Sequence, residues 1–174
     1  HPLLSDRLAE VARAALLDAG APDGSLEMVV GYDAGVALVR DEGVAALAFT
    51  GSQAAGLALW RIANERRTVI PTYAEMSTVN PVVVTRAAAA TRMEEIAEGF
   101  VGSFTLGSGQ FCTKPGLVFA PAGAAAAEAI GRALRQASPE PVMLTAAIAR
   151  SIAEGLEELR FAGARVVELV EASV

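Results

Sequence analysis

Residues 44–56 read V-A-A-L-A-F-T-G-S-Q-A-A-G, an apolar run that ends in a short turn of polar residues and glycine. The run Val44–Phe49 is typical of a buried strand, and the residues after the turn predict a helix to about Asn64. A second strand is expected to begin at residues 68–71. Strand, turn, helix and strand in this order predict two parallel strands joined by a crossover. The stretch therefore indicates an α/β fold.

Apolar periodicity predicts further elements on both sides of this unit. Helices are expected at residues 5–20, 35–40, 91–107, 122–136 and 144–162, and strands at residues 26–30, 116–120 and 165–170. Residues 73–84 mix a strand-like run with one acid and an Asn-Pro break, so a crossover between two lobes is expected there.

Composition excludes several classes of protein. The chain has 174 residues, 53% of them hydrophobic, and a net charge of −6, which disfavours nucleic-acid binding because phosphate contacts need clustered Lys and Arg. One Cys and one His exclude an internal disulfide and a Cys/His metal site. No apolar run approaches the roughly 20 residues that span a bilayer. We expect a cytoplasmic protein with no nucleic-acid or membrane partner.

The turn F-T-G-S-Q-A-A-G at residues 49–56 is the first candidate site. Glycine between a strand and a helix lets the backbone approach a ligand, and free N–H groups at a helix start attract phosphate. A tight turn with close packing at Gly56 explains the same residues without a ligand. Both interpretations stay open on this stretch alone.

Glu75 and Cys112 are the candidate reactive side chains. Glu75 is a lone acid in an apolar context, where desolvation would suit a general base, although local sequence alone favours a carboxylate at a strand end facing solvent, because Glu is seldom fully buried. Cys112 follows a helix in a glycine-rich loop, where backbone N–H groups can hold a thiolate or an oxyanion, but a buried inert thiol is also possible. His1, the sole histidine, is poorly placed as a base. If Cys112 is a nucleophile, its expected helper is Glu75.

Taken in order, F-T-G-S-x-x-x-G, then E-M-S-T-V-N-P at residues 75–81, then G-Q-F-C at residues 109–112 resemble the aldehyde dehydrogenase superfamily. Two longer segments are most similar to the α-ketoglutaric semialdehyde (2,5-dioxovalerate) dehydrogenase branch: P-T-Y-A-E-M-S-T-V-N-P (71–81) and T-L-G-S-G-Q-F-C-T-K-P-G-L-V (105–118). Ser77-Thr78 departs from the superfamily, most of which has two glycines there. This bulkier pair could change how Glu75 swings between conformations.

The resemblance implies an α/β chain made of parts of two Rossmann-like parallel-sheet lobes. Residues 1–74 would be the C-terminal part of the NAD(P)-binding domain, and residues 75–174 the N-terminal part of the catalytic domain. Family members are several hundred residues long, so this chain would cover only their middle part. Their upstream oxyanion Asn and ribose-binding Lys have no counterpart motif here.

The resemblance also implies roles for individual residues. Cys112 would attack the aldehyde to give a thiohemiacetal and then a thioester, and Glu75 would activate the hydrolytic water. Gly51 and Ser52 would lie along the cofactor, and Gly56 would permit close helix packing beside it.

Three further residues, Gln110, Phe111 and Thr113, would form the substrate and oxyanion neighbourhood. No residue is expected to bind a metal.

The expected function is NAD(P)-dependent oxidation of α-ketoglutaric semialdehyde, with NADP preferred over NAD. The partner would be a small aldehyde, and the complete protein would be a homo-oligomer. Two alternatives stay open: a truncated, inactive chain of the same fold, and cofactor-independent acyl transfer through the same thiol.

Overall fold

The computed structural model describes residues 2–77, 79–167, 169–170 and 173, and the chain divides into two compact units. The first unit spans His1–Met76 and the second spans Ser77–Val174. This division places Glu75 in the first unit, whereas the predicted boundary lay just before it. The assignment of the two parts to cofactor binding and catalysis remains a prediction. His1 and Thr78 lie outside the described residues.

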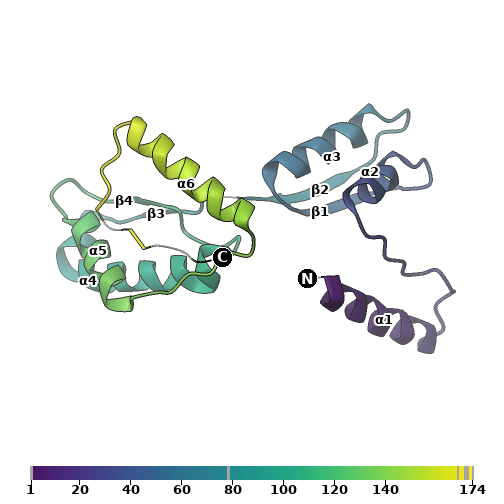
Figure 1. Ribbon diagram of the computed structural model, residues 1–174, viewed down its shortest axis with the longest axis horizontal. Helices are drawn as coiled ribbons and strands as arrows, with labels where there is room; N and C mark the ends of the chain where they lie inside the picture. The colour runs from purple at the N-terminus through teal and green to yellow at the C-terminus, as the bar shows by residue number, and fades with distance from the viewer. Residues whose placement is uncertain (1, 78, 168, 171–172, 174) are drawn as a thin grey trace. The chain divides into compact units, whose positions relative to one another are not determined.

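The first unit contains helices α1 (Pro2–Asp18), α2 (Tyr32–Arg40) and α3 (Gln53–Glu65) and strands β1 (Leu47–Gly51) and β2 (Thr72–Met76), which Figure 1 traces. The strands pair in parallel, from Leu47 opposite Thr72 to Gly51 opposite Met76. The predicted parallel pair with an intervening helix is therefore confirmed, although the second strand begins at Thr72 and not at residues 68–71. α3 packs against both strands.

The core of this unit lies beside the paired strands. Val39, Ala63 and Ile70 are buried, and partly buried aliphatic side chains surround them. The predicted strand at residues 26–30 is wrong, because this segment has no regular structure in the described chain. Val29 and Val30 are exposed, so apolar residues alone did not create a strand without a neighbour to pair with.

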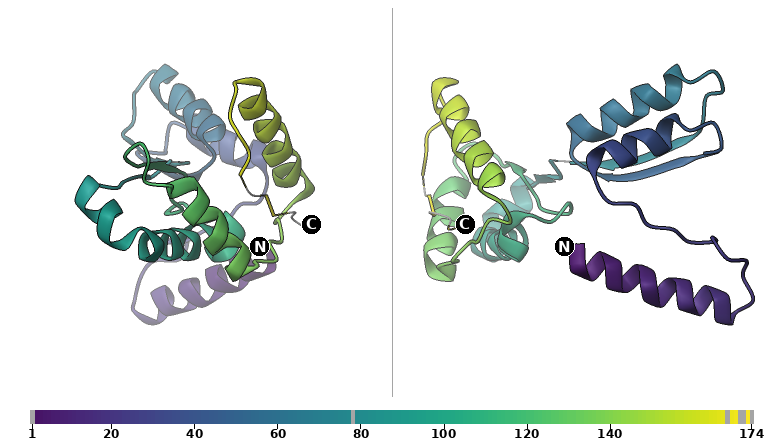
Figure 2. Two further views of the ribbon diagram at one scale, coloured as in Figure 1. Left: turned by 90° about the vertical axis from the view of Figure 1, so that its left-hand side faces the viewer. Right: turned by 45° about the vertical axis from the view of Figure 1, so that its right-hand side comes forward.

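The second unit contains strands β3 (Pro81–Val83) and β4 (Leu117–Phe119), helices α4 (Arg86–Thr105), α5 (Ala126–Ala137) and α6 (Ala146–Phe161), and the 3-10 turn η1 (Leu106–Gly109). The two strands are again parallel, from Pro81 opposite Leu117 to Val83 opposite Phe119. α4 and α5 lie side by side, as Figures 1 and 2 show. Their buried contact uses small residues, among them Ala97, Ala129 and Ala133, which let helices approach closely.

Several boundaries of the second unit differ from the predicted ones. α4 begins five residues before the predicted start at Thr91, because Thr85 caps it and alanines, which have high helix propensity, follow. Its backbone is non-helical at Arg92, beside the predicted start. α5 begins late because Ala125 adopts the left-handed conformation. The predicted strand at residues 165–170 includes Glu168, which lies outside the described residues, and the others form no strand.

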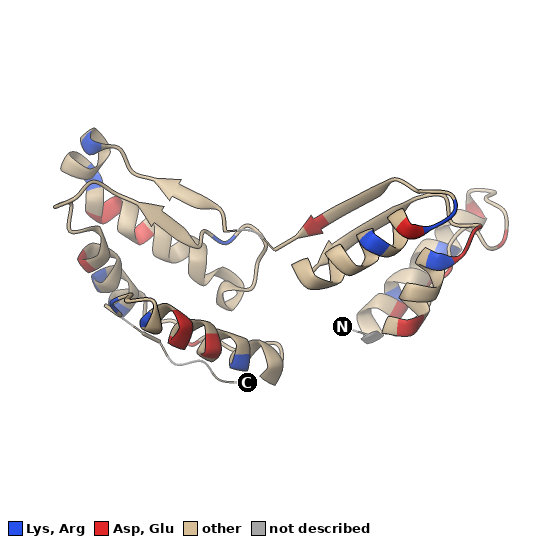
Figure 3. Cartoon of the chain, turned by 90° about the horizontal axis from the view of Figure 1, so that it is seen from above, with Lys and Arg blue, Asp and Glu red and all other residues tan. Residues whose placement is uncertain are grey.

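Charged residues lie mainly on the helices, with both signs interspersed (Figure 3). Within the four strands of the described chain, Glu75 is the one charged residue. No helix in the described part of the chain is both long and apolar enough to span a bilayer. The expected α/β class, with small parallel sheets, is confirmed.

Candidate active site

The turn after β1 is built around a helix cap. Ser52 precedes α3, and its Oγ accepts a hydrogen bond of 3.3 Å from the backbone N–H of Ala55. Gly51 and Ser52 are exposed, and the first turn of α3, all of which is described, carries no acidic side chain. The first N–H groups of a helix have no acceptor within the helix. This end of α3 therefore offers exposed donors with no carboxylate in the same helical turn.

Gly56 has a different role from its two neighbours. It is buried on α3, where a Cβ atom would lie 2.5 Å from Met76 Sδ and 3.2 Å from the Phe49 ring. The absence of a side chain lets the helix lie directly on β1 and β2. Gly56 thus contacts the strands, whereas Gly51 and Ser52 face solvent at the turn.

Glu75 lies on β2 directly opposite Thr50 of β1. Side chains alternate along a strand, and those of residues 72, 74 and 76 are partly covered while Tyr73 and Glu75 are exposed. Glu75 is therefore on the face of the strand pair that α3 does not cover. The solvent-facing interpretation describes its place in this chain.

Cys112 lies in a tight turn between η1 and β4. The Lys114 backbone N–H donates to the Phe111 carbonyl at 3.1 Å, so Cys112 and Thr113 are the two central residues of the turn. The thiol is free and exposed, and Thr113 is exposed beside it. The prediction that the thiol is buried is therefore wrong.

Both peptide groups that flank Cys112 have their carbonyls engaged. The Phe111 carbonyl accepts from Lys114, and the Cys112 carbonyl accepts from the Asn80 side chain at 2.8 Å. The Cys112 N–H belongs to the same trans peptide group as the Phe111 carbonyl and points in the opposite direction. Because the Phe111 carbonyl accepts a hydrogen bond inside the turn, the Cys112 N–H points out of it. Within the described part of the chain this N–H makes no hydrogen bond.

Asn80 is the residue of this site that sequence reasoning missed. Its amide nitrogen donates to the carbonyls of both Cys112 and Lys114, at 2.8 and 3.1 Å. The available signal was the Asn-Pro pair after Glu75, which in the sequence marks the expected crossover between lobes and forms part of the family pattern. Asn is also one of the few non-glycine residues that tolerate the positive φ of 45° found here.

The Gln110 side chain faces the segment before α6. Its amide donates to the Val142 carbonyl at 3.0 Å, and its Oε1 accepts from the Leu144 N–H at 2.9 Å. Ser108 adds a third link, since its Oγ accepts from the Val142 N–H at 3.1 Å. Gln110 thus lies two residues from Cys112 in the sequence and uses its polar atoms to hold the loop.

Phe111 is half exposed, and its ring packs over Gly107, where a Cβ would lie 2.5 Å from the ring. The φ of 58° at Gly107 also favours glycine. Glycine at position 107 therefore makes room for the Phe111 ring. The structure thus gathers Cys112, Thr113, Phe111 and Asn80 in the second unit, and Gly51, Ser52 and Glu75 in the first.

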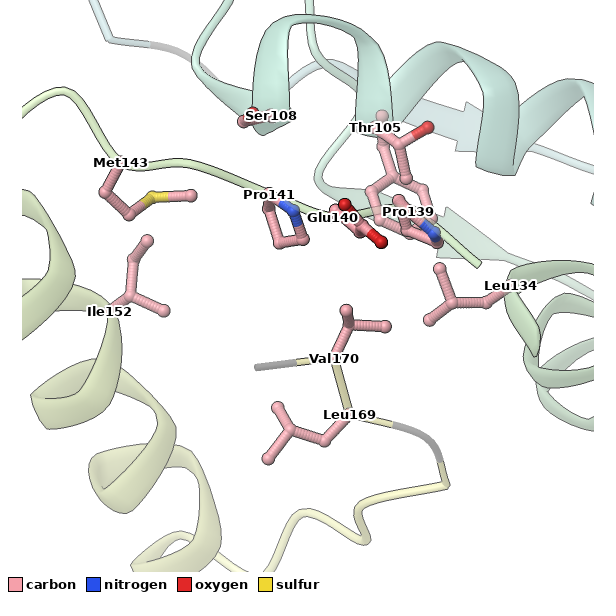
Figure 4. A pocket seen from close by; sticks show the side chains of 12 residues that line it. Thr105, Ser108, Leu134, Pro139, Glu140, Pro141, Met143, Ile152, Leu169 and Val170 are labelled. Atoms are coloured by element: carbon pink, nitrogen blue, oxygen red, sulfur yellow. The ribbon is translucent and has the colours of Figure 1, made fainter. Parts of the chain in front are cut away.

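An apolar pocket of about 480 Å³ lies nearby in the second unit (Figure 4). Ile152 of α6 and the side chains of Leu169 and Val170 lie around it, with Met143 and Glu140 from the segment before α6. Ser108 and Gly109 line it, whereas Gln110 and Cys112 do not. The thiol is therefore outside this pocket.

Solved structures share the fold of this chain. Proline utilization A from Bradyrhizobium japonicum, in a variant form, superposes with a TM-score of 0.72 at 22% identity, over 90% of this chain and 17% of that one. A Thermus 1-pyrroline-5-carboxylate dehydrogenase with bound NAD gives a TM-score of 0.64 at 22% identity, over 80% of this chain and 30% of that one. Identities this low establish the fold alone.

Sequence relatives are more informative. Alpha-ketoglutaric semialdehyde dehydrogenase 2 of Azospirillum brasilense is 44% identical over 168 residues, which cover 91% of this chain and 31% of that protein. Alpha-ketoglutaric semialdehyde dehydrogenase of Acinetobacter baylyi is 38% identical over 162 residues, with the same two coverages. This chain thus spans about a third of the length of these relatives.

Residues 1–142 match the aldehyde dehydrogenase family. The resemblance found in the three ordered motifs is thereby confirmed, as is its similarity to the α-ketoglutaric semialdehyde dehydrogenases. The chain belongs to the aldehyde dehydrogenase family.

Proposed function

We propose that the complete polypeptide carrying this chain oxidises α-ketoglutaric semialdehyde to its carboxylate with NAD(P), using Cys112 as the nucleophile. The observation that carries the reaction is the exposed thiol in a turn whose two flanking carbonyls are both engaged. The choice of substrate is supported by the 44% identity to the Azospirillum brasilense enzyme.

The chemistry assigned to Cys112 follows from the geometry of its turn. The thiolate attacks the aldehyde carbon, and the new oxyanion lies beside the outward-pointing Cys112 N–H, which stabilises it. The resulting thiohemiacetal becomes a thioester once hydride has left the carbon. Phe111 and Thr113 lie on either side of Cys112 and would contact the substrate. Gln110 instead holds the loop through its hydrogen bonds to Val142 and Leu144.

The turn after β1 fits the diphosphate of a dinucleotide. Gly51 and Ser52 are exposed, and the start of α3 presents backbone donors without an acidic neighbour. Gly56 would keep α3 close to the strands and so fix the direction of these donors. When bound, the nicotinamide supplies the hydride acceptor for the reaction.

Glu75 is assigned the hydrolytic step. Its exposed carboxylate, opposite Thr50, is accessible to water. In the hydrolytic step the carboxylate removes a proton from the water molecule that attacks the thioester. Ser77, which is exposed, follows in place of the glycine most common in the family. We further propose that NADP is preferred over NAD, that the complete protein is a homo-oligomer, and that it acts in the cytoplasm.

Replacement of the nucleophile tests this function. In the complete polypeptide, Cys112→Ser should abolish formation of reduced cofactor from α-ketoglutaric semialdehyde, because a serine hydroxyl is not ionised near neutral pH. The control is Ser151→Ala, a change of an exposed residue on α6, which should leave turnover unchanged. Undiminished turnover by Cys112→Ser would overturn the proposal.

A further inference from the structure

We infer that Asn80 is a positioning residue of the thiol site: its amide bridges the carbonyls of Cys112 and Lys114 and so holds the turn from which the Cys112 N–H points toward the developing oxyanion. The inference rests on the proposed function insofar as Cys112 is the nucleophile. It adds a residue whose side chain acts on the backbone of the turn and touches neither substrate nor cofactor.

The two donors of one amide meet two carbonyls of the same turn. Asn80 Nδ2 lies 2.8 Å from the Cys112 oxygen and 3.1 Å from the Lys114 oxygen. A primary amide carries two N–H groups, so each carbonyl can receive its own proton. The reverse orientation would place the amide oxygen against two carbonyl oxygens, which excludes it. Asn80 therefore bridges the two ends of the Cys112–Lys114 segment.

Asn80 is itself held in place by the backbone. The Gly116 N–H donates to the carbonyl of the preceding residue, Val79, at 2.7 Å, immediately before β3 and β4 begin to pair. The strand pair thus fixes the backbone from which the amide projects. The Asn80 amide in turn holds the Cys112 turn, whose residues are not paired in a strand.

The position also selects the residue type. The φ of 45° at Asn80 is left-handed, where glycine and asparagine are the residues best tolerated. Glycine would keep this backbone but remove both donors. Aspartate keeps the shape but would direct a charged acceptor at two carbonyl oxygens. These two substitutions separate the backbone requirement from the hydrogen bonds.

Two thiol reactions distinguish aiming of the N–H from general integrity of the turn. With p-nitrophenyl acetate, Cys112 Sγ bonds to the ester carbon, the carbon–oxygen bond breaks, and nitrophenolate leaves with the electron pair while the thiol proton goes to solvent. This acylation develops an oxyanion. Alkylation by iodoacetamide displaces iodide and develops none.

The experiment compares both rates at Cys112 in the complete polypeptide, read by peptide mass. Asn80→Gly should lower the ratio of acylation to alkylation by about tenfold or more, since loss of one oxyanion donor typically costs 10² or more and here the donor is misdirected. Asn80→Asp should lower it at least as far. Ser108→Ala, which removes a link of the same loop to Val142, should leave the ratio unchanged.

The outcomes separate this inference from the proposed function. An unchanged ratio in Asn80→Gly, with normal dehydrogenation by the unsubstituted protein, would overturn the positioning role alone. A lowered ratio in a protein without dehydrogenase activity would support the role and overturn the function. If Cys112 of the unsubstituted protein is not acylated at all, both are overturned.

Discussion

The two units place their candidate residues at opposite ends of their strands. In the first unit, Ser52 follows the last residue of β1, and Glu75 lies next to the last residue of β2. In the second unit, Asn80 immediately precedes β3, and the Cys112 turn comes before β4. The first arrangement uses the carboxyl ends of parallel strands, where α/β proteins commonly bind ligands.

The difference shows two ways of presenting backbone N–H groups. In the first unit a helix start leaves donors free, and a side-chain cap satisfies only one of them. In the second unit no helix begins directly after the thiol. The Phe111–Lys114 hydrogen bond orients the peptide that carries the Cys112 N–H, and the Asn80 side chain holds the rest of the turn. The first mechanism is local in sequence, whereas the second joins residues 32 positions apart.

After loss of the thiol, the largest effect on the reaction rate is expected from replacement of Glu75. This change tests whether the first unit contributes to the chemistry. Glu75→Gln should leave acylation of Cys112 nearly unchanged and slow thioester hydrolysis by about 10²-fold, the low end for loss of a general base. Rapid mixing should then show a burst of reduced cofactor and a slow phase. Equal slowing of both phases would contradict this division of labour between the units.

A smaller effect is expected from a pair of matched glycines, one in each unit. Gly56→Ala should destabilise the protein by about 1–3 kcal/mol, since the new Cβ would meet Met76 Sδ at 2.5 Å. Gly102→Ala, on α4 with no atom near its Cβ, should stabilise by up to about 1 kcal/mol. Denaturant unfolding of the complete polypeptide measures both. Equal effects on the free energy of unfolding would show that packing of α3 on the strands does not require glycine at position 56.

The smallest expected effect concerns Glu128 in the first turn of α5. Its own backbone N–H and then Arg165, at 3.3 Å, lower the pKa of this exposed carboxyl. A lowered pKa means that the stabilisation is present above the pKa of the unfolded chain and is lost as pH falls through the folded value. Arg165→Gln should raise the pKa toward its ordinary value in an NMR titration. An unmoved pKa would assign the shift to the helix start alone.

Local pattern predicted much of the fold but not its exact edges. The order of the helices followed from periodicity, because apolar residues repeated at helical spacing form one face that can be buried. The strand at residues 26–30 failed because a strand requires a neighbour, which its own sequence cannot specify. α5 began later than its alanines indicated, because Ala125 takes a left-handed conformation.

The candidate site was predicted residue by residue but not as a network. Cys112, Glu75 and the turn at Gly51 were found from motifs, while Gln110 was expected near substrate and instead hydrogen-bonds the segment before α6. Asn80 was overlooked because its partners are carbonyls of a distant loop. Backbone acceptors carry no sequence signature, so no motif could have revealed them.

The sequence by itself determined the family and the α/β class and singled out Cys112 as the candidate nucleophile, because these depend on residue types in a fixed order. Only the tertiary structure decided that the thiol is exposed, that Gly56 contacts strands, and that one amide bridges the Cys112 turn. The physical reason is that exposure and hydrogen bonding depend on which segments meet. Pairing of β3 with β4 brings together Asn80 and Cys112, which are 32 positions apart in the sequence.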